Sequence, residues 1–581
     1  MPIIKELEVV NSKSYDFIIV GAGNAGVVIA NRLSENPDWS VLLIEAGGSD
    51  AGIQEIAVPV LSASASPNKP YNWNYTLAPQ LNLRGRSLPY PRGKILGGST
   101  SIHYNVYTRG SAEDYNRIAS VTEDEGWGWA SLLPYARKAE NFVPPTEFRD
   151  ITGETDPSCY GAGGPISISL PNHTYDFNTR VIEVSNELPE FPYNKNNNSG
   201  NPLGLGWLTS TVGGGVRNSS TRYLSPDVVA RPNFDILIEA QVTSLSYCSS
   251  EKAVPRVGGV FFAHAANSPI YKVSATKEVI LSAGAIATPQ LLLLSGIGPR
   301  DALEAKNIPV VKDLPDVGKG LQDHCWIVNK FEVNAKDTPD SINNDPAYAA
   351  KEFEQYMKAH AGGLANGLAG AVLFDRLPQD SPFVGGPDDP VAGPNTPHYE
   401  LIFGPGFLRV LEDSTPAEGN YVVMGCIVVS PNSRGSVELA SSDPFDDPII
   451  DLNLLGSEYD RHVMFTALKQ VQKFASAPIF KDYIIRPYGA FANVKDDDDL
   501  REYIEEWTTT IWHPSCTAAM SKRGCSTGVV DPDLKVKGVS SLRVVDSSVV
   551  PFIISAHTQA SMYMIAERAA DLIKVEYHFS P

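Results

Sequence analysis

The sequence predicts an α/β fold, α+β overall, in which a Rossmann-like nucleotide-binding domain is joined to a second domain of sheet and helices. The first observation is a strand–helix–strand pattern around a glycine fingerprint near the start of the chain. The second is a group of strand-like runs between residues 399 and 439. The third is the length of 581 residues, which exceeds what one hydrophobic core supports.

The first unit combines two buried strands and a helix. Tyr15–Val20 is a short apolar run with β-branched residues that ends in glycine, as a buried parallel strand does. A helix is predicted over Ala25–Leu33 and the next strand over Ser40–Ile44. Together these segments predict one βαβ unit.

The turn between the first strand and the helix fits the pattern G-x-G-x-x-G over residues 21–26. Gly21 permits the tight turn, Gly23 lets the backbone approach a pyrophosphate, and Gly26 allows close packing of helix on strand. Glu45 follows Gly26 by 19 residues (45 − 26 = 19), where an acid binds ribose hydroxyls. This combination predicts FAD or NAD in preference to NADP.

The rest of the first domain is predicted from composition. Residues 51–91 and 141–201 are rich in turn-forming residues and read as loops. Strands are expected between 234 and 282, including Asp235–Ile238 and Glu278–Leu281, followed by a helix over Thr288–Leu294.

For the second domain, residues 337–365 are expected to be helical and 378–397 a loop. Strands over Tyr399–Phe403, Tyr421–Val429 and Ser436–Leu439 suggest one sheet. Asp496–Asp499 allows a metal site, but a solvated helix N-terminus is favoured because Asp complements the helix dipole. The expected boundaries are 14–325, with excursions at 51–91 and 141–205, then 326–524, and 525–575 returning to the first domain.

Composition excludes several classes of function. The net charge of −20 argues against nucleic acid, because phosphate binding needs clustered Lys and Arg. No apolar run reaches the ~20 residues that span a bilayer. The six cysteines form no C-x-x-C pair. Cys516 and Cys525 are close enough in sequence to bridge, but free buried thiols are favoured.

Four N-x-S/T sequons begin at Asn74, Asn172, Asn197 and Asn218. They favour a secreted glycoprotein, although the first 14 residues do not resemble a signal peptide and an intracellular location stays open. We expect a monomer.

Two histidines suggest the chemistry. His513 follows Trp512 and His557 follows Ala556, 44 positions apart (557 − 513 = 44). A neutral imidazole at ~2.6–3.2 Å from a hydroxyl can remove its proton. Opposite a bound flavin, which accepts hydride, two imidazoles form a base-and-donor pair for oxidising alcohols.

Three further segments carry a family resemblance: residues 92–103, 282–298 and 530–547. They match the signatures and the C-terminal flavin-contact region of the glucose–methanol–choline (GMC) oxidoreductases, and the resemblance runs from about Tyr15 to about Ile573. Within that family the chain looks most like the fungal aryl-alcohol oxidases. The segments shared with those oxidases are 73–75, 90–93, 102–104, 124–127 and 531–538.

The resemblance implies bound FAD, with His513 as catalytic base and His557 as its assistant. A histidine at position 103 is covalently bonded to flavin in the related pyranose dehydrogenases but not in the aryl-alcohol oxidases, so the resemblance favours non-covalent FAD. The implied FAD-binding residues are Gly21, Gly23, Asn24, Ala25, Gly26, Glu45, Ala46, Trp73, Arg92, Gly97, Ser99, His103, Asn105, Val106, Val242, Ala283, Asp546, Ser547, Thr558 and Gln559.

The resemblance also implies aromatic substrate contacts at Tyr104, Trp512 and Phe407, or Leu408 with a one-residue shift. The expected reaction is oxidation of a primary aromatic or conjugated alcohol to its aldehyde, with dioxygen reduced to hydrogen peroxide. Two alternatives stay open: a dehydrogenase of alcohols or sugars with quinone acceptors, and a flavin-containing hydroxynitrile lyase.

Overall fold

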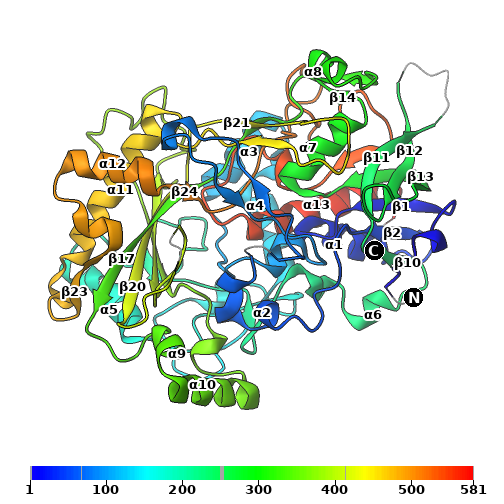
Figure 1. Ribbon diagram of the computed structural model, residues 1–581. Coiled ribbons are helices and arrows are strands. Elements are labelled where there is room, and N and C mark those ends of the chain that lie inside the picture. Colours follow the sequence, from blue (N-terminus) through cyan, green and yellow to red (C-terminus); the bar gives the residue numbers. More distant parts are fainter. Residues whose placement is uncertain (1–2, 67–68, 249–253, 412–413, 580–581) are drawn as a thin grey trace.

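The computed structural model describes residues 3–66, 69–248, 254–411 and 414–579. Two large sheets lie on opposite sides of the molecule, with helices α1 (Asn24–Leu33), α7 (Gly284–Leu294) and α13 (Gln559–Glu576) beside the first sheet (Figure 1). Each sheet has its own hydrophobic core. The predicted two-part α/β architecture is therefore confirmed.

The first sheet is Rossmann-like, with the strand order β10-β2-β1-β13-β12-β11 and β25 paired to β13. All pairs are parallel except β11–β12 and β12–β13, which are antiparallel. The strands are β1 Ser14–Val20, β2 Val41–Ile44, β10 Phe234–Leu237, β11 Gln241–Tyr247, β12 Val257–Ala263, β13 Tyr271–Leu281 and β25 Leu542–Val544. The predicted βαβ unit is confirmed, with α1 at Asn24–Leu33.

Helix α7 spans Gly284–Leu294 and begins four residues before the predicted start (288 − 284 = 4). The Asp546 carboxylate accepts hydrogen bonds from the Gly284 N–H and the Thr288 hydroxyl and so secures the first turn. Pro289 lies inside this helix and lacks the N–H that would bond to the Ala285 carbonyl. The Thr517 hydroxyl donates to that carbonyl at 2.7 Å instead.

The second sheet is antiparallel and has the order β23-β17-β20-β19-β18-β7, with β24 paired to β17. One face packs against helices α5 and α11, and the other faces the first domain. The strands are β7 Gly204–Trp207, β17 Cys325–Val333, β18 Ala371–Asp375, β19 Tyr399–Pro405, β20 Tyr421–Val428, β23 Ile484–Tyr488 and β24 Thr509–Thr510.

One strand of the second domain was assigned to the wrong sheet. Segment β21 (Gly435–Glu438) pairs with β16 (Lys319–Leu321) and β22 (Ile449–Asp451) in a separate three-stranded sheet. The prediction over Ser436–Leu439 was right about the strand and wrong about its partners, because pairing depends on long-range contacts that local pattern does not report.

The observed helix boundaries in the second domain differ in detail from the predicted ones. The predicted helical region 337–365 is divided into α9 (Asp340–Asn344) and α10 (Pro346–Ala359), because Pro346 cannot continue the preceding helix. Asp496 caps α12 (Asp497–Trp507), which confirms a helix N-terminus at the aspartate run. Helices α11 (Glu458–Ala475) and α13 (Gln559–Glu576) are the longest.

Helix α5 (Asp176–Glu187) lies where a loop was predicted, so that expectation was wrong. Its Asn, Thr and β-branched residues lower its intrinsic helix propensity. Burial of Phe177, Val181 and Val184 in the second core stabilises it. Helix α5 and strand β7 therefore attach the excursion 141–205 to the second sheet.

The chain returns to the first domain before residue 525. The backbone N–H groups of Cys516, Ala518 and Met520 donate to the carbonyls of residues 547–549, next to β25. The return therefore starts directly after the His513 segment, which places this histidine at the junction of the two domains.

The exposure of the cysteines and of the sequon asparagines tests the expectations about thiols and glycosylation. All six cysteines are free, but Cys525 is exposed and Cys159 and Cys248 are half-buried, so the expectation of buried thiols was wrong for these three. Asn74 is exposed. The other three sequon asparagines are at most 3% exposed, and their amides donate to backbone carbonyls. The sequon pattern is therefore weak support for a glycoprotein.

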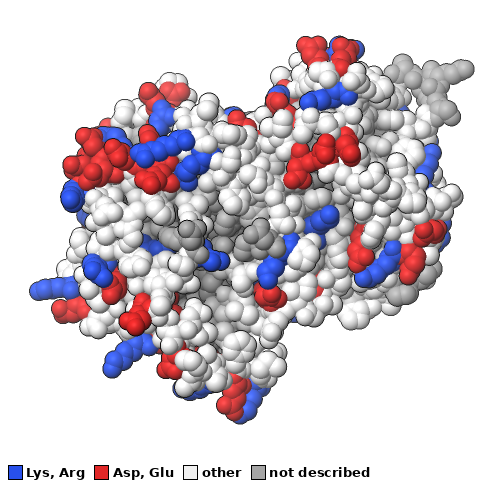
Figure 2. Space-filling model, in the orientation of Figure 1, with Lys and Arg blue, Asp and Glu red and all other residues white. Residues whose placement is uncertain are grey.

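Acidic side chains gather over α12 on the face shown in Figure 2, including Asp497–Asp499 of its first turn. Within the four described stretches of chain, no helix combines the length and apolar character needed to cross a membrane.

The Thr517 contact predicts a measurable loss of stability. Thr517→Val removes the donor to the Ala285 carbonyl and keeps the side-chain volume, so the unfolding free energy should fall by about 1–3 kcal/mol. Thermal unfolding of the holoprotein measures this change. Thr517→Ser is the matched control and should retain most of the melting temperature; equal losses in both variants would contradict the hydrogen-bond explanation.

Candidate active site

A cavity of about 300 Å³ lies between the two sheets. The loops that follow β1, β2 and β13 of the first sheet form one end, and β17, β19 and β20 of the second sheet form the other. Pockets at domain junctions of this kind commonly bind cofactors and substrates.

Most predicted site residues line this one cavity, although they come from segments spread along the whole chain. They are Gly21, Gly23, Asn24, Ala25, Glu45, Ala46, Trp73, Arg92, Ser99, His103, Tyr104, Val106, Val242, Ala283, Trp512, His513, Asp546, Ser547, His557, Thr558 and Gln559.

Four predicted residues do not line the cavity. Gly26 packs so closely on the fingerprint turn that a Cβ there would lie 1.9 Å from the Gly21 carbonyl oxygen. Gly97 and Asn105 lie just behind the lining. The ring of Phe407 packs on Tyr421 and Tyr488, away from the cavity, and Leu408 takes the lining position.

The nucleotide end combines a tight backbone approach with one buried acid. The Glu45 carboxylate accepts from the N–H groups of Ala22 (2.9 Å) and Gly47 (2.8 Å). Burial raises the pKa of Glu45 to about 7. The first residues of α1, α7 and α13 all line the cavity, so three helix N-termini present partial positive charge there.

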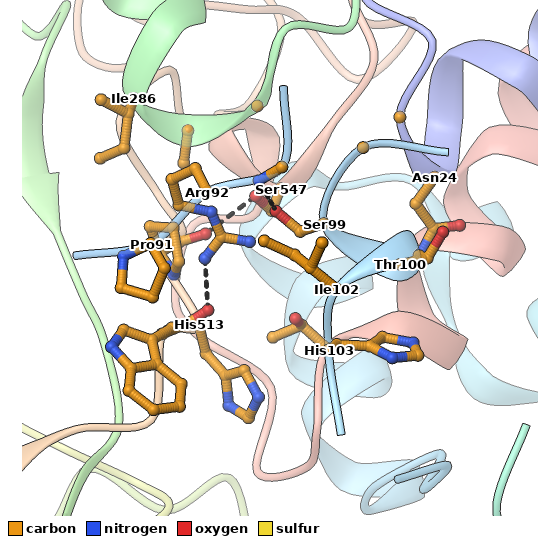
Figure 3. A pocket seen from close by; sticks show the side chains of 18 of the residues that line it. Asn24, Pro91, Arg92, Ser99, Thr100, Ile102, His103, Ile286, His513 and Ser547 are labelled. Carbon is orange, nitrogen blue, oxygen red and sulfur yellow. Dashed lines mark hydrogen bonds between the residues drawn. The ribbon is translucent and has the colours of Figure 1, made fainter. Parts of the chain in front are cut away.

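Two glycine-rich loops meet at this end. The Gly97 N–H donates to the Ala22 carbonyl at 2.8 Å. A Cβ on Gly98 would lie 2.7 Å from the Gly23 Cα, so only glycine allows the second loop to touch the fingerprint turn. Figure 3 shows Thr100 of this loop near Asn24.

Several buried polar atoms in or beside the lining have no hydrogen-bond partner among the described residues. They are Asn24 Oδ1, His103 Nε2, both amide atoms of Asn105, and Ser282 Oγ. Buried polar groups in proteins are almost always paired. Together with the glycine cradle and Glu45, these atoms fit a large polar cofactor such as FAD.

At the other end, His513 is held by contacts to its backbone and its ring. The Asp323 carboxylate accepts from the His513 N–H at 2.7 Å, and Arg92 donates to the Trp512 carbonyl at 2.5 Å. Figure 3 shows Arg92 reaching this segment from the opposite loop. Nδ1 of His513 lies 3.0 Å from Nδ1 of His324.

The residue before His513 has an unusual backbone. Trp512 has φ +63°, in the left-handed region that bulky residues rarely adopt. The Arg92 contact to its carbonyl and a 2.8 Å hydrogen bond from its N–H to the Thr510 hydroxyl maintain this conformation. The turn aims the Trp512 ring and the His513 ring into the same cavity.

His557 stands opposite, directly before α13. Its ring centroid lies 4.9 Å from that of His513, at 79° between the ring planes. Its Nε2 lies 3.0 Å from the Oε1 of Glu400, a β19 residue that is 1% exposed. A hydroxyl bound between the rings can therefore meet two imidazoles with different partners.

Burial and nearby positive charge keep the imidazoles of His513, His103 and His324 neutral. Desolvation first, and then His557, His324 and Arg92, hold the pKa of His513 well below its usual value. Burial and Arg217 lower the pKa of His103 to about 3, and burial lowers that of His324 to about 3. A neutral His513 is the form that can accept a proton.

The wall around the histidines is apolar. Alternate residues of the second-sheet strands face the cavity, as the two-residue period of a strand requires. The lining here is Tyr104, Trp326, Val328, Ile402, Leu408, Val423, Ile511 and Trp512. Trp512 packs edge-on against Tyr104 (5.6 Å) and Trp326 (6.2 Å).

Sequence reasoning missed Asp323, His324 and Glu400. Asp323 and His324 directly precede the apolar strand β17, so their position at a strand end was a usable signal. Glu400 lies inside a strand, and its sequence neighbours give no sign of its contact with His557.

This arrangement defines the class of protein: an enzyme that holds a dinucleotide-type cofactor against a histidine pair. A model of the N-terminal part of GMC oxidoreductases matches residues 15–326, and one of the C-terminal part matches residues 431–566. The chain belongs to the GMC oxidoreductase family.

Relatives in sequence carry dehydrogenase names. Pyranose dehydrogenase 3 of Leucoagaricus meleagris is 38% identical over 97% of this chain and 93% of the relative. Dehydrogenase eriK of Hericium erinaceus is 37% identical over 97% and 94%.

Two solved structures with the same fold have oxidase names. A variant of formate oxidase from Aspergillus oryzae RIB40 has a TM-score of 0.89 at 30% identity, covering 98% of this chain and 99% of that one. A fungal aryl-alcohol oxidase has a TM-score of 0.81 at 26% identity, covering 97% and 99%.

Proposed function

We propose that this enzyme uses FAD to oxidise primary aromatic or conjugated alcohols to aldehydes, with His513 as general base. The observation that carries the proposal is a neutral, cavity-lining imidazole, paired with His557, inside an apolar wall. An alcohol bound there can lose its hydroxyl proton to His513 while its carbon faces the cofactor end of the cavity.

FAD would be held by the Gly21–Gly26 turn, the Gly97–Ser99 loop, Glu45 and the N-termini of α1 and α13. When bound, FAD supplies the acceptor for the carbinol hydride and returns the two electrons to dioxygen or a quinone. The protein contributes the binding energy, the orientation and the proton acceptor.

We propose that FAD is held without a covalent bond to His103, as the resemblance of this chain to the aryl-alcohol oxidases implies. Nδ1 of His103 accepts from an Arg217 guanidinium N–H (2.9 Å) and from the Asn105 N–H (3.1 Å), so the single proton of the neutral ring lies on Nε2. A bond from Nε2 to the cofactor would replace that proton and leave both hydrogen bonds to Nδ1 intact, so these contacts are compatible with either mode of attachment.

The two active-site histidines would divide the work. His513 takes the hydroxyl proton, because its ring is neutral and lines the cavity. His557, whose Nε2 lies 3.0 Å from the Glu400 carboxylate, would contact the substrate hydroxyl from the opposite side and orient it. General-base assistance of this kind contributes typically ~10²–10⁴-fold to rate.

The apolar wall favours aromatic alcohols over sugars. A pyranose has a hydroxyl on most ring carbons, and each hydroxyl buried without a partner costs about 1–3 kcal/mol. The wall formed by Tyr104, Trp326, Val328, Ile402, Leu408, Val423, Ile511 and Trp512 offers indole, phenol and aliphatic groups. A flat conjugated ring can pack on the faces and edges of Tyr104 and Trp512.

The acceptor has two candidates. Dioxygen as the acceptor is favoured by the names of two structurally similar proteins, formate oxidase and aryl-alcohol oxidase. The second candidate, a quinone, is favoured by the dehydrogenase names of the relatives in sequence. Trp512 stands beside the base, where its indole narrows the path that either acceptor must take.

The base role predicts the effect of His513→Ala. Anaerobic mixing with 4-methoxybenzyl alcohol should bleach the flavin absorption of the wild-type enzyme, and the variant should bleach at least ~10²-fold more slowly. FAD content, measured by absorbance, should stay unchanged. Unchanged bleaching in the variant would remove His513 from this role. An unbleached wild type would favour cyanohydrin cleavage, which needs no net redox change.

The lowered pKa of His513 predicts an unusual pH profile. Because the protonated ring cannot act as base, activity is lost only as pH falls through the lowered pKa, well under the ordinary value of 6.5. The rate of alcohol-driven bleaching should therefore be flat through pH 6.5 in stopped-flow measurements. Reduction by dithionite at each pH is the control. A half-maximal rate near pH 6.5 would contradict this expectation.

The acceptor question is resolved by comparing turnover under air with turnover on 1,4-benzoquinone under nitrogen. An oxidase should release one hydrogen peroxide for each aldehyde formed under air. Enzyme that stays bleached for minutes in air, yet turns over rapidly on the quinone, would exclude the dioxygen reaction and assign the second candidate.

A further inference from the structure

We propose that His324 is a positioning residue that fixes the tautomer of His513, so that the Nε2 lone pair of His513 faces the substrate. This inference rests on the proposed function of His513 and adds a residue that sequence reasoning did not identify. His324 does not line the cavity and is 1% exposed, so it cannot act on substrate directly.

The two rings meet through their Nδ1 atoms, 3.0 Å apart, with ring planes at 87°. Two neutral imidazoles in such a contact share one hydrogen: one Nδ1 must donate and the other must accept. The direction of this hydrogen bond determines which nitrogen of His513 carries its lone pair into the cavity. The proposed role of His513 as base assigns that direction.

The required direction follows from which nitrogen of His513 is left for the substrate. Nδ1 of His513 faces His324, so Nε2 is the nitrogen that can meet the substrate, and a base must present it without a proton. The single proton of the neutral His513 ring then lies on Nδ1, and Nδ1 of His324 accepts it. The proton of His324 lies on its Nε2, which is buried and has no partner among the described residues.

It follows that His513 donates from Nδ1 and keeps its Nε2 unprotonated. A base of this type needs a third group that orients it. In this site that group is a neutral imidazole, whereas His557 has the Glu400 carboxylate as its partner. A carboxylate stabilises a protonated ring, but an imidazole acceptor adds no negative charge, so the two histidines are suited to different tasks.

The backbone holds His324 in register with His513. Strand β17 pairs with β24, with Cys325 opposite Thr510. The Ile511 N–H donates to the His324 carbonyl at 2.9 Å. Asp323 accepts from the N–H groups of both histidines, each at 2.7 Å. Movement of either ring is therefore restricted by contacts on both strands.

Two variants of similar size separate hydrogen bonding from packing. His324→Asn places an amide oxygen near the Nδ1 position and keeps an acceptor for His513, while His324→Leu removes it. Each variant is mixed anaerobically, as holoenzyme, with 4-methoxybenzyl alcohol. The limiting rate of flavin bleaching and the dissociation constant of the alcohol are measured separately.

We expect His324→Leu to lower the limiting rate roughly ten- to hundredfold, less than loss of the base itself, with the dissociation constant changed less than about threefold. His324→Asn should stay within about threefold of wild type. Equal rates in Leu, Asn and wild type, or equal losses in both variants, would overturn the proposal. His398→Leu, which removes a buried imidazole outside the cavity, controls for general destabilisation.

A second measurement needs no turnover and no variant of His324. In the wild-type holoenzyme labelled with ¹⁵N-histidine, the His513 signals are those missing from His513→Gln. Protonated Nδ1 and unprotonated Nε2 are expected; the opposite tautomer would overturn the proposal. If alcohol bleaches neither wild type nor variants, the proposed function fails, and the ¹⁵N result still determines whether His324 fixes the tautomer.

Discussion

The site depends on the buried carboxylate of Asp323 at the junction of the two domains. It accepts hydrogen bonds from the His513 N–H, the Thr510 hydroxyl, the Tyr90 hydroxyl and the His324 N–H. Burial raises its pKa, which is the electrostatic cost of keeping an acid there, and these donors and Arg92 offset that cost. One carboxylate thus fixes the relative positions of segments more than 400 residues apart in the chain (510 − 90 = 420).

The two ends of the cavity differ in electrostatics: one stabilises a buried acid, and the other disfavours a positive charge on a histidine. At the nucleotide end, the N–H groups of Ala22 and Gly47 donate to the buried Glu45, and the N-termini of α1, α7 and α13 line the cavity with partial positive charge. At the histidine end, burial and neighbouring cationic groups disfavour protonation of His513. The same exclusion of water therefore supports cofactor binding at one end and a free base at the other.

The local sequence pattern was sufficient to predict structure where the stabilising contacts lie within one continuous segment. The β1–α1–β2 unit was predicted because strand, turn, helix and acid follow one another in sequence. The family resemblance predicted that His513 and His557 would share one site, and both line the same cavity. The prediction failed where the deciding contact is distant. Helix α5 forms against its propensity because the second sheet buries it, β21 pairs outside the expected sheet, and Glu400 meets His557 across a domain junction. The turn at Gly406 (φ +85°) orients Phe407 away from the cavity, a difference that spacing along the chain cannot report.

The left-handed backbone of Trp512 has a consequence for the way this pocket can evolve. For L-residues that conformation costs roughly 1–2 kcal/mol relative to the right-handed one, and glycine or asparagine would relieve it. Natural variation that relaxes this turn would therefore also remove the ring that walls the pocket and loosen the loop that carries His513. A substitution at position 512 therefore changes substrate selectivity and protein stability together. Substitutions of Leu408 or Ile402 can alter the substrate range without changing the backbone that holds His513.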